Sequence, residues 1–469
     1  MFHVRNAART RQRAPVAAAR GRRRARPDRR IHGAVLTERD RDGNLVAGTQ
    51  RAADLAQRYG TPLLVIDLDA VDDAIERLVS CAAKRPLDIS YAAKAFATIE
   101  FFRHLGRHPI GLDLCSVGEL VTAERAGIAP QRLTLHGAGK TDDELRAAVD
   151  GRVGFIAVDG LEELERLNAL ARDGCAAQIL LRLNLGIDTR THAYVRTGGE
   201  DTKFGIPSRD EAAVLAILRD HVQLRFAGLH AHVGSQIFDI EPYVGTASAL
   251  MDAAERFAHA GLVTERIVIG GGFGVGTHPG ERTSLDVAAA IAAAGEHVAQ
   301  RAREARLPPI RLGIEPGRAI VASAGMTLYR VLAIKRQSHR TFVVVDGGMA
   351  ENPRPALYGA RHDVVTVAPG EGDELEITLC GRSCENDELG IARLPQGLRA
   401  GDLLAMRATG AYTYSMAGNY NRFPRPAVVG VARGSHRLLA RRETLDDVLR
   451  ADAVSDPSEI ESGRQRAAF

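Results

Sequence analysis

Short apolar runs alternate with helical stretches from about residue 60 to residue 317, and this alternation constrains the fold more than any other feature of the sequence. After an opening run at 63–67, eight more runs each predict a β-strand. The stretches between them, such as 142–149, 161–172 and 285–306, have the spacing of helices. Eight strands with helical crossovers predict a (β/α)8 TIM barrel, because a doubly wound sheet usually has roughly five to seven strands. The predicted strands are 89–94, 111–116, 133–137, 155–159, 179–184, 226–233, 267–272 and 312–317.

Polar residues stand where these predicted strands end. In a barrel of this kind the chemistry lies at the C-terminal ends of the strands, and side chains from several strands converge there. Strands without a site would end in ordinary turn residues, so these ends predict a functional site. The residues at the strand ends are Lys94, Asp113, His136, Arg182 with Asn184, His232, Gly270 to Gly272 and Glu315.

The pattern changes after about Met326. Runs at 341–346, 363–367, 375–379 and 403–408 are short and β-rich, and Gly/Pro turns rather than helices separate them, which predicts a C-terminal antiparallel β domain. The full expectation is an α/β barrel followed by this β domain. We divide the chain into an Arg-rich extension (1–30), a segment joining the β domain (31–60), the barrel (61–326), the β domain (327–445) and a tail (446–469).

The basic charge of the chain is confined to its first thirty residues. They contain eleven Arg, no Lys and one acid, Asp28, and so contribute +10 to a net charge of +4. The remaining 439 residues therefore carry −6, which argues against nucleic acid as a partner of the body. With almost no large apolar side chains, residues 1–30 are expected to be disordered. We favour a solvated extension, with a transit peptide and a nucleic-acid-binding arm as the alternatives.

The composition also bears on the compartment. No apolar run approaches the ~20 residues of a membrane helix, and no apolar segment follows the basic start as in a secretory signal. Five scattered cysteines are too few for a disulfide framework, and the spacing of Cys380 and Cys384 fits neither a redox pair nor a zinc knuckle. We expect a cytoplasmic protein that does not contact membranes.

Lys94 ends the first predicted barrel strand, within apolar neighbours (Ser90-Tyr91-Ala92-Ala93-Lys94-Ala95-Phe96). Such a lysine is either a surface residue or a functional amine. Burial lowers the pKa of an ammonium group, which is what a Schiff-base lysine requires.

A glycine-rich segment, Gly270 to Gly276, follows the seventh strand. It does not satisfy G-x-G-x-x-G in any register, so a Rossmann site is excluded. In barrels the loops after strands seven and eight commonly bind phosphate through backbone amides. The alternative is a glycine-rich bend without a ligand.

Glu315 begins the segment Glu-Pro-Gly-Arg at the end of the eighth strand. A carboxylate beside a pyridine nitrogen keeps that nitrogen protonated and makes a pyridoxal ring a stronger electron sink. A structural ion pair with a nearby arginine is the alternative.

His230 and His232 are two residues apart and therefore on one face of a strand. This spacing fits a zinc site of a barrel hydrolase, a buried hydrogen-bonded histidine, or a ring that stacks on a planar cofactor. No other His-rich strand end completes a ligand set, so we expect no metal. In the β domain, Cys384 lies on a turn before acidic residues, where it can act as a proton donor.

Together these segments resemble the fold-type III pyridoxal-phosphate decarboxylases, most closely the diaminopimelate decarboxylases. The resemblance covers nearly the whole body of the chain, and its specificity comes from eleven segments in order. They are YAAKAF (91–96), GLDLCSVGEL (111–120), HGAGK (136–140), DTKFGI (201–206), HVGSQIF (232–238), GGGFG (270–274), EPGR (315–318), DGGM (346–349), NPRPALYG (352–359), CE (384–385) and GAYTYSMAGNYN (410–421).

The resemblance implies an alanine-racemase-like barrel, pyridoxal 5'-phosphate as cofactor and a homodimer with shared active sites. Lys94 would bond the cofactor covalently, His232 would stack on its ring, and Glu315 would pair with its nitrogen. Its phosphate would be held by Ser235, Gly271 and Gly272, with Arg318 nearby, and Tyr412 would close the site. Cys384 would reach across the dimer interface and protonate the product carbon.

The resemblance further implies decarboxylation of meso-2,6-diaminopimelate to L-lysine and CO2, the last step of lysine biosynthesis. Arg318, Arg354 and Tyr358 can clamp the distal carboxylate of that substrate, and Glu385 can take its ammonium. Two positions depart from the family pattern: Ala138 replaces an expected Asn, and the turn after Cys384 is one residue shorter. A displaced Glu385 would alter substrate choice, so the alternative is a paralogous decarboxylase acting on a related amino acid or a carrier-bound intermediate.

Overall fold

The computed structural model describes residues 38–83, 85–171, 174–186, 201–220, 223–282 and 284–453. The expectations for the Arg-rich extension 1–30 and for most of the tail, from residue 454, lie outside these described residues. Each described helix is either too short or too polar to cross a membrane.

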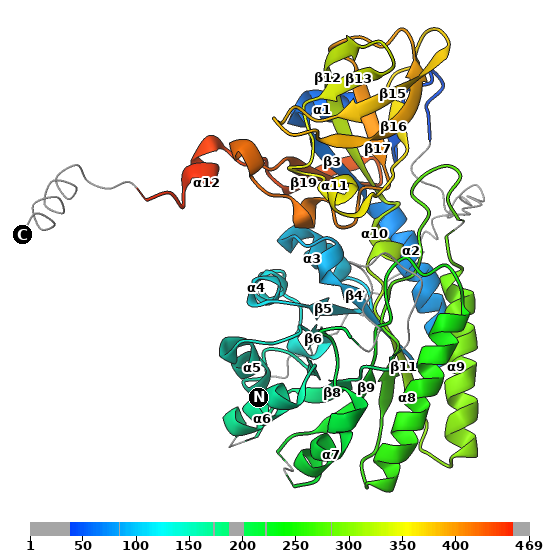
Figure 1. The fold of residues 1–469 in the computed structure, drawn as a ribbon, viewed down its shortest axis with the longest axis vertical. Coiled ribbons are helices and arrows are strands. Elements are labelled where there is room, and N and C mark those ends of the chain that lie inside the picture. The colour runs from blue at the N-terminus through cyan, green and yellow to red at the C-terminus, as the bar shows by residue number, and fades with distance from the viewer. Residues whose placement is uncertain are drawn as a thin grey trace, which may run out of the picture. The chain divides into compact units, whose positions relative to one another are not determined.

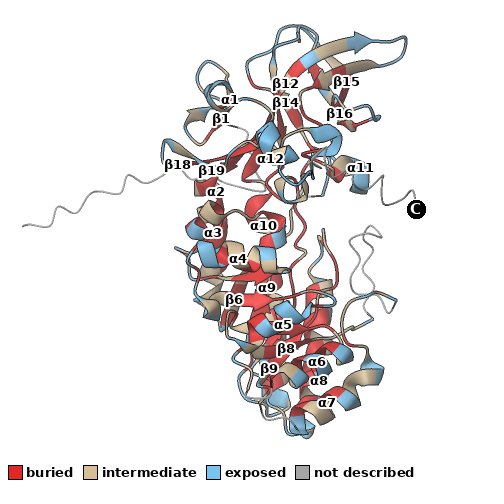
Figure 2. Ribbon diagram, turned by 90° about the vertical axis from the view of Figure 1, so that its left-hand side faces the viewer, coloured by how far each residue is buried: buried red, intermediate tan, exposed pale blue. Residues whose placement is uncertain are grey.

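Eight parallel strands close into a barrel, which confirms the predicted (β/α)8 architecture (Figure 1). Most of their residues are buried, as the red strands β6, β8 and β9 in Figure 2 illustrate. Each of the eight predicted strands overlaps one barrel strand. The strands are β4 (Leu87–Ala92), β5 (Gly111–Leu114), β6 (Leu133–Leu135), β7 (Phe155–Val158), β8 (Gln178–Arg182), β9 (Phe226–His230), β10 (Arg266–Val268) and β11 (Arg311–Ile314).

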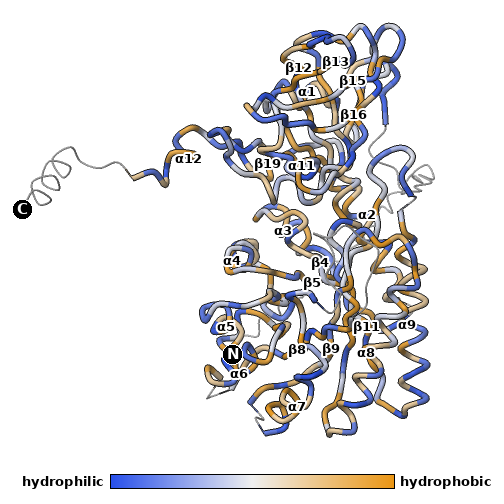
Figure 3. The backbone as a smooth tube through the Cα atoms, viewed as in Figure 1, coloured by the Kyte–Doolittle hydropathy of each residue, from blue (hydrophilic) through white to orange (hydrophobic). Residues whose placement is uncertain are grey.

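Helices connect the barrel strands and turn a hydrophobic face toward them. In Figure 3 α8 and α9 show alternating hydrophobic and hydrophilic patches along their length. The predicted helix 142–149 is α5, which begins with a capping box in which Thr141 and Glu144 bond each other's backbone amides. The helices are α2 (Leu68–Ala82), α3 (Ile99–Leu105), α4 (Val117–Arg125), α5 (Asp142–Val149), α6 (Leu161–Leu170), α7 (Glu211–Asp220), α8 (Glu241–His259) and α9 (Val287–Glu304).

A second sheet of nine strands forms the β domain, and its long central strand β12 pairs with three neighbours. Most neighbours run antiparallel, but β3 with β18 and β13 with β15 run parallel. The strands are β3 (Leu63–Asp67), β12 (Gly325–Arg336), β13 (Thr341–Val345), β14 (Val364–Thr366), β15 (Glu374–Cys380), β16 (Glu388–Pro395), β17 (Leu403–Arg407), β18 (Ala427–Ala432) and β19 (Ser435–Ala440).

The opening strand β3 belongs to this second sheet, although the expected barrel range of 61–326 included it. It lies between β12 and β18, and all five of its residues are buried. Four of its five residues are apolar, and such a run is buried on both faces in either kind of sheet, so its sequence does not reveal its partners. The barrel therefore begins after β3, with α2 as the connection to β4.

Residues 45–59 pack against the β domain. They form β1 (Val46–Ala47), β2 (Gln50–Arg51) and α1 (Ala52–Tyr59). The Leu45 amide donates to the carbonyl of Val367 at 2.8 Å, and Leu55 shares a buried cluster with Met326 of β12. This short N-terminal unit thus covers one face of the second sheet.

The loops of the β domain reach the C-terminal end of the barrel. The Tyr412 amide donates to the carbonyl of Ala95 at 2.7 Å, and the Ser415 hydroxyl donates to the same carbonyl at 3.2 Å. The short elements near this junction are η1 (Ala93–Ala95), α10 (Arg318–Val321), α11 (Arg354–Tyr358), η5 (Tyr414–Met416) and η6 (Tyr420–Arg422), and α12 (Leu445–Leu449) follows β19.

Candidate active site

A cavity of about 150 Å³ lies at the C-terminal ends of the barrel strands. It gathers residues from seven strand ends together with one residue of the β domain. Its lining includes Lys94, Asp113, Cys115, His136, Arg182, Phe204, His230, His232, Ser235, Gly272, Glu315, Arg318 and Tyr412. The polar strand ends of the sequence thus converge on one enclosed space.

Lys94 enters this cavity from η1, the 3-10 turn that follows β4. Burial disfavours its ammonium form, but Tyr412, Cys115 and Glu315 outweigh that effect, and the pKa of Lys94 is raised. This is opposite to the lowering expected from burial alone. The neighbours of this amine, rather than its burial, therefore set the direction of its pKa shift.

Glu315 lines the same cavity as Lys94 and lies between two histidines. Its carboxylate lies 3.1 Å from Nε2 of His230 and 3.3 Å from Nε2 of His136. Burial would raise the pKa of Glu315, but these two histidines lower it below its usual value. Burial also lowers the pKa of His136 to about 3, so this ring is neutral at pH 7. His230 hydrogen-bonds the carboxylate, whereas the buried Nε2 of His136 has no hydrogen-bond partner among the described residues. The site therefore holds an ionised carboxylate.

His232 lies just beyond β9 and faces the cavity. Its Nδ1 accepts the amide of Gly271 at 3.2 Å, which fixes the ring. Burial, and then the nearby Lys94, lower the pKa of His232, so the ring is neutral. Gly272 lines the cavity, whereas Gly271 is not among the lining residues and uses its amide on His232. A side chain at Gly271 would collide with the backbone oxygen of Glu315.

Arg318 supplies unused donors on one side of the cavity. Among the described residues, its Nε and Nη1 atoms are buried and have no hydrogen-bond partner. Its Nη2 donates to the Ser235 hydroxyl at 3.4 Å, and its guanidinium lies 4.8 Å from the centre of the Tyr412 ring. A buried cation with two free donors is costly unless an anion completes it. These residues therefore fit a phosphate group, and together with Lys94 and Glu315 they fit pyridoxal 5'-phosphate.

Arg354 and Tyr358 lie on α11, outside the cavity lining but near Arg318. Burial, and then the charge of Arg318, lower the pKa of Arg354 to about 9, so the guanidinium is still charged at pH 7. Its Nη1 donates to the carbonyl of Ala411, next to Tyr412. Two buried arginines side by side form a second place for an anionic group.

Cys384 and Glu385 do not reach the cavity of their own chain. Both are exposed on the segment between β15 and β16, where the Tyr420 hydroxyl donates to Glu385. Asp387 holds this segment: its carboxylate accepts the Met349 amide at 2.6 Å and the Ser383 hydroxyl at 2.7 Å. The shortened turn is thus anchored to the DGGM loop.

The lining also contains charged and imidazole side chains that were not among the expected ligands, namely Asp113, His136, Arg182 and His230. The first three had been noted as polar strand ends, and His230 as the partner of His232 in the H-x-H pair. The rule that barrel chemistry gathers at strand ends identifies them. Phe204 also lines the cavity, and it lies in the DTKFGI segment, where an aromatic residue alone gives no such signal.

Comparison with protein families finds a match to the pyridoxal-dependent decarboxylases, pyridoxal binding domain, over residues 68–322. A diaminopimelate decarboxylase of Actinosynnema pretiosum subsp. auranticum is 42% identical over 418 residues, covering 87% of this chain and 93% of that protein. The diaminopimelate decarboxylase of Bacillus subtilis is 36% identical, covering 90% of this chain and 98% of that protein.

Solved structures of diaminopimelate decarboxylases are also similar to this chain. The diaminopimelate decarboxylase of M. jannaschii in complex with L-lysine superposes with a TM-score of 0.81 at 27% identity, covering 91% of this chain and 99% of that one. The Helicobacter pylori diaminopimelate decarboxylase complexed with L-lysine gives 0.77 at 29% identity, covering 87% and 99%.

Proposed function

This chain belongs to the diaminopimelate decarboxylases, a family of pyridoxal-dependent decarboxylases, and from that premise we propose that it converts meso-2,6-diaminopimelate to L-lysine and CO2. Its cofactor is pyridoxal 5'-phosphate. The observation that carries the proposal is the cavity in which Lys94, the ionised Glu315 and the unpaired donors of Arg318 face one another. The reaction is the last step of lysine biosynthesis.

The bound cofactor supplies an aldehyde that condenses with an amine and a ring that accepts the electron pair left by a departing carboxylate. Lys94 would hold the cofactor through its Nζ at rest and would carry protons at that atom during turnover. Glu315 would face the ring nitrogen and keep it protonated, and His230 hydrogen-bonds this carboxylate at 3.1 Å. His232 would pack against the ring face, and Ser235, Gly272 and Arg318 would bind the phosphate, whereas Gly271, expected there from the sequence, uses its amide on His232.

The second anion site, formed by the two buried arginines, fits the distal carboxylate of the substrate. Arg318, Arg354 and Tyr358 bind the carboxylate that stays on the product, and Tyr412 covers the reacting end. Because Glu385 and Cys384 are exposed and outside the cavity of their own chain, we assign them to the site of a second copy in a homodimer. There Glu385 takes the distal ammonium and Cys384 donates the proton that replaces CO2.

A paralogous decarboxylase acting on a related amino acid is the second candidate. The observation that favours it is the short turn Cys384-Glu385-Asn386-Asp387, in which Asp387 has a positive φ of 44°. A residue at positive φ re-aims the turn that carries Glu385, the group expected to select the distal ammonium.

The domain division and the location are also proposals. With β3 moved to the β domain, we propose a barrel from α2 to about residue 324, between the N-terminal and C-terminal parts of the β domain. We propose a cytoplasmic location because all five cysteines lie among the described residues as free thiols.

Incubation of the purified protein with meso-diaminopimelate, lysine, ornithine and arginine, with CO2 release measured for each, tests the proposal. Release from meso-diaminopimelate alone supports it. Release from another of these amino acids alone supports the paralogue. No release from any of the four, with the cofactor bound, contradicts the proposed substrate.

A further inference from the structure

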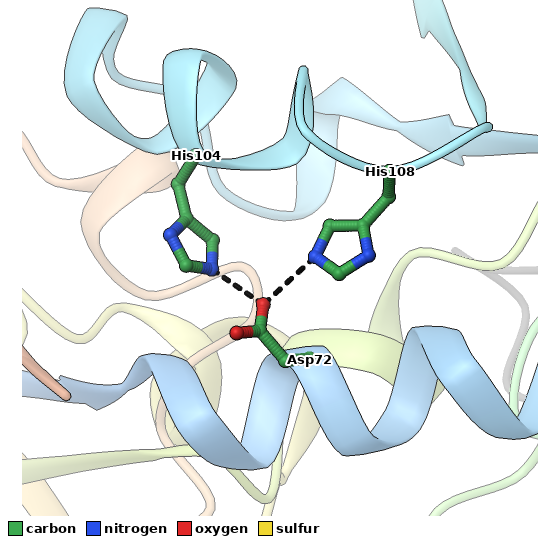
Figure 4. A group of neighbouring side chains, drawn as sticks. All are labelled: Asp72, His104 and His108. Atoms are coloured by element: carbon green, nitrogen blue, oxygen red, sulfur yellow. Dashed lines mark hydrogen bonds and ion pairs between the residues drawn. The ribbon is translucent and has the colours of Figure 1, made fainter. Parts of the chain in front are cut away.

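A second group of metal-ligand side chains lies outside the active site, where α2 packs beside α3. Asp72 is on α2, His104 is in the last turn of α3, and His108 follows three residues after that helix ends. Figure 4 shows both imidazole rings turned toward the carboxylate of Asp72. Nε2 of His104 lies 2.6 Å and Nε2 of His108 lies 2.8 Å from the same oxygen, Oδ1.

The donor set is one that transition metals take. Two imidazole nitrogens and one carboxylate oxygen lie within 4.8 Å of one another. The two histidines are four residues apart in sequence, but only His104 is on α3, and the turn after that helix brings His108 to the same carboxylate. Three protein ligands of this type with water in the fourth position form a common tetrahedral Zn²⁺ site.

A purely structural hydrogen-bonded cluster is the competing explanation. In that case a buried acid usually pairs with a lysine or arginine, or divides its donors between both oxygens. Within the described part of the chain, Asp72 forms ion pairs with these two histidines alone, and both nitrogens point at one oxygen. An ion held between these three ligand atoms would replace the two hydrogen bonds that now end on this oxygen.

Nδ1 of His104 is buried and has no hydrogen-bond partner among the described residues. A ring that binds a metal through Nε2 carries its proton on Nδ1, where no acceptor is in place. The same missing partner removes the outer support that metal-binding histidines usually have. Loss of such a supporting hydrogen bond typically costs about 10–100-fold in metal affinity, so we expect a micromolar rather than a nanomolar dissociation constant for Zn²⁺.

Access and room are adequate for an ion. The His104 side chain is 5% exposed, but Asp72 and His108 are 20% and 16% exposed, so solvent reaches the cluster from their side. Bonds of about 2.0–2.2 Å around a tetrahedral ion separate the ligand atoms by roughly 3.3 Å. The nitrogen–oxygen distances must therefore open by roughly 0.5–0.7 Å, and His108, on a loop, can supply much of that movement.

We propose that Asp72, His104 and His108 form a structural site for a divalent transition metal, with Zn²⁺ the best match to its two imidazoles and one carboxylate. The ion ties α2 to α3 on either side of β4, the strand that leads to Lys94. This site is separate from the decarboxylation chemistry. Its function is to stabilise the folded chain, because a ligand that binds only the folded state raises stability.

Calorimetric titration of the untagged, full-length holoenzyme with Zn²⁺ tests the proposal. The cofactor is kept saturating because His136, His230 and Glu315 in the active site form a second possible ligand set. Asp72→Asn and His108→Ala each remove one ligand. His259→Ala is the matched control, because His259 is also in the last turn of a helix but is exposed and alone.

We expect one micromolar Zn²⁺ site in the wild type and in the control, weakened more than about 100-fold in both cluster variants, since a direct ligand matters more than its outer support. Equal Zn²⁺ affinity in all four proteins would place the ion elsewhere and overturn the proposal, as would no binding by the wild type. As a second measurement, Zn²⁺ should raise the melting temperature of the wild type and the control, but not of the two variants. A rise in the variants equal to that of the wild type would overturn it too.

Discussion

Nε2 of His230 lies 3.1 Å from the carboxylate of Glu315, so the ends of β9 and β11 are joined across the intervening strand β10. His230 is 1% exposed and His136 approaches the same carboxylate from β6. Because both rings act on one acid, Glu315 stays ionised in spite of its burial. An ionised carboxylate at this depth is the electrostatic element that a protonated pyridine nitrogen requires.

Replacement of Glu315 by glutamine should lower kcat for decarboxylation by about 100-fold or more, the usual range for a positioned group that holds a catalytic proton. The cofactor should still bind, because Lys94 and the Arg318 side of the cavity are unchanged. Steady-state kinetics and the visible absorbance of the cofactor measure these two properties. Glu315→Asp, which keeps the negative charge, should lower kcat less than Glu315→Gln does. Equal rates for Glu315→Gln and the wild type would refute the assigned role.

Lys94→Ala should abolish covalent attachment of the cofactor. Borohydride reduction followed by peptide mass analysis should find the cofactor on Lys94 in the wild type and on no lysine in the variant. Lys203→Ala is a suitable control, since Lys203 is exposed in the DTKFGI segment. Trapping on a lysine other than Lys94 would contradict the assignment.

The sequence predicted the barrel well because its signals are local. Strand length, apolar runs and helical spacing each involve neighbouring residues, and α5 has the predicted bounds because Thr141 and Glu144 form its capping box. The sheet that contains β3 was not predictable in this way, because its partners β12 and β18 are far along the chain and the strand is apolar on both faces.

The sequence predicted which residues form the site better than it predicted their pKa shifts. Strand ends identified Lys94, His232 and Glu315 as neighbours, but the pKa of Lys94 depends on charges contributed by Tyr412, Cys115 and Glu315. Those charges come from separate elements, so no sequence window contains them. The exposure of Cys384 is equally a property of the folded chain.

A shared active site predicts complementation between inactive variants. Cys384→Ala should cut turnover by about 100-fold while the visible absorbance of the cofactor stays intact. When Lys94→Ala and Cys384→Ala subunits are mixed and allowed to exchange, half of the dimers are hybrids with one native site each. Activity should then rise to about a quarter of the wild-type value. If mixing restores no activity although subunits exchange, Cys384 serves the cavity of its own chain.

Glu351 should make the stability of the β domain depend on pH. Burial raises its pKa to about 7, while its carboxylate accepts the Gly348 amide at 2.7 Å. Because the folded chain holds this proton more tightly than the unfolded chain, the stabilisation is complete below pH ~4.5 and is lost as the pH rises through 7. The loss amounts to about 3 kcal/mol at most.

Glu351→Gln keeps the oxygen that accepts the Gly348 amide but cannot ionise. Its melting temperature, followed from pH 5 to pH 8, should fall less than that of the wild type, and the difference should be largest at pH 8. Glu371→Gln, at an exposed acid in the same domain, should follow the wild type at every pH. Parallel curves for Glu351→Gln and the wild type would show that Glu351 carries the same charge in the folded and unfolded chains, contrary to its burial beside Gly348.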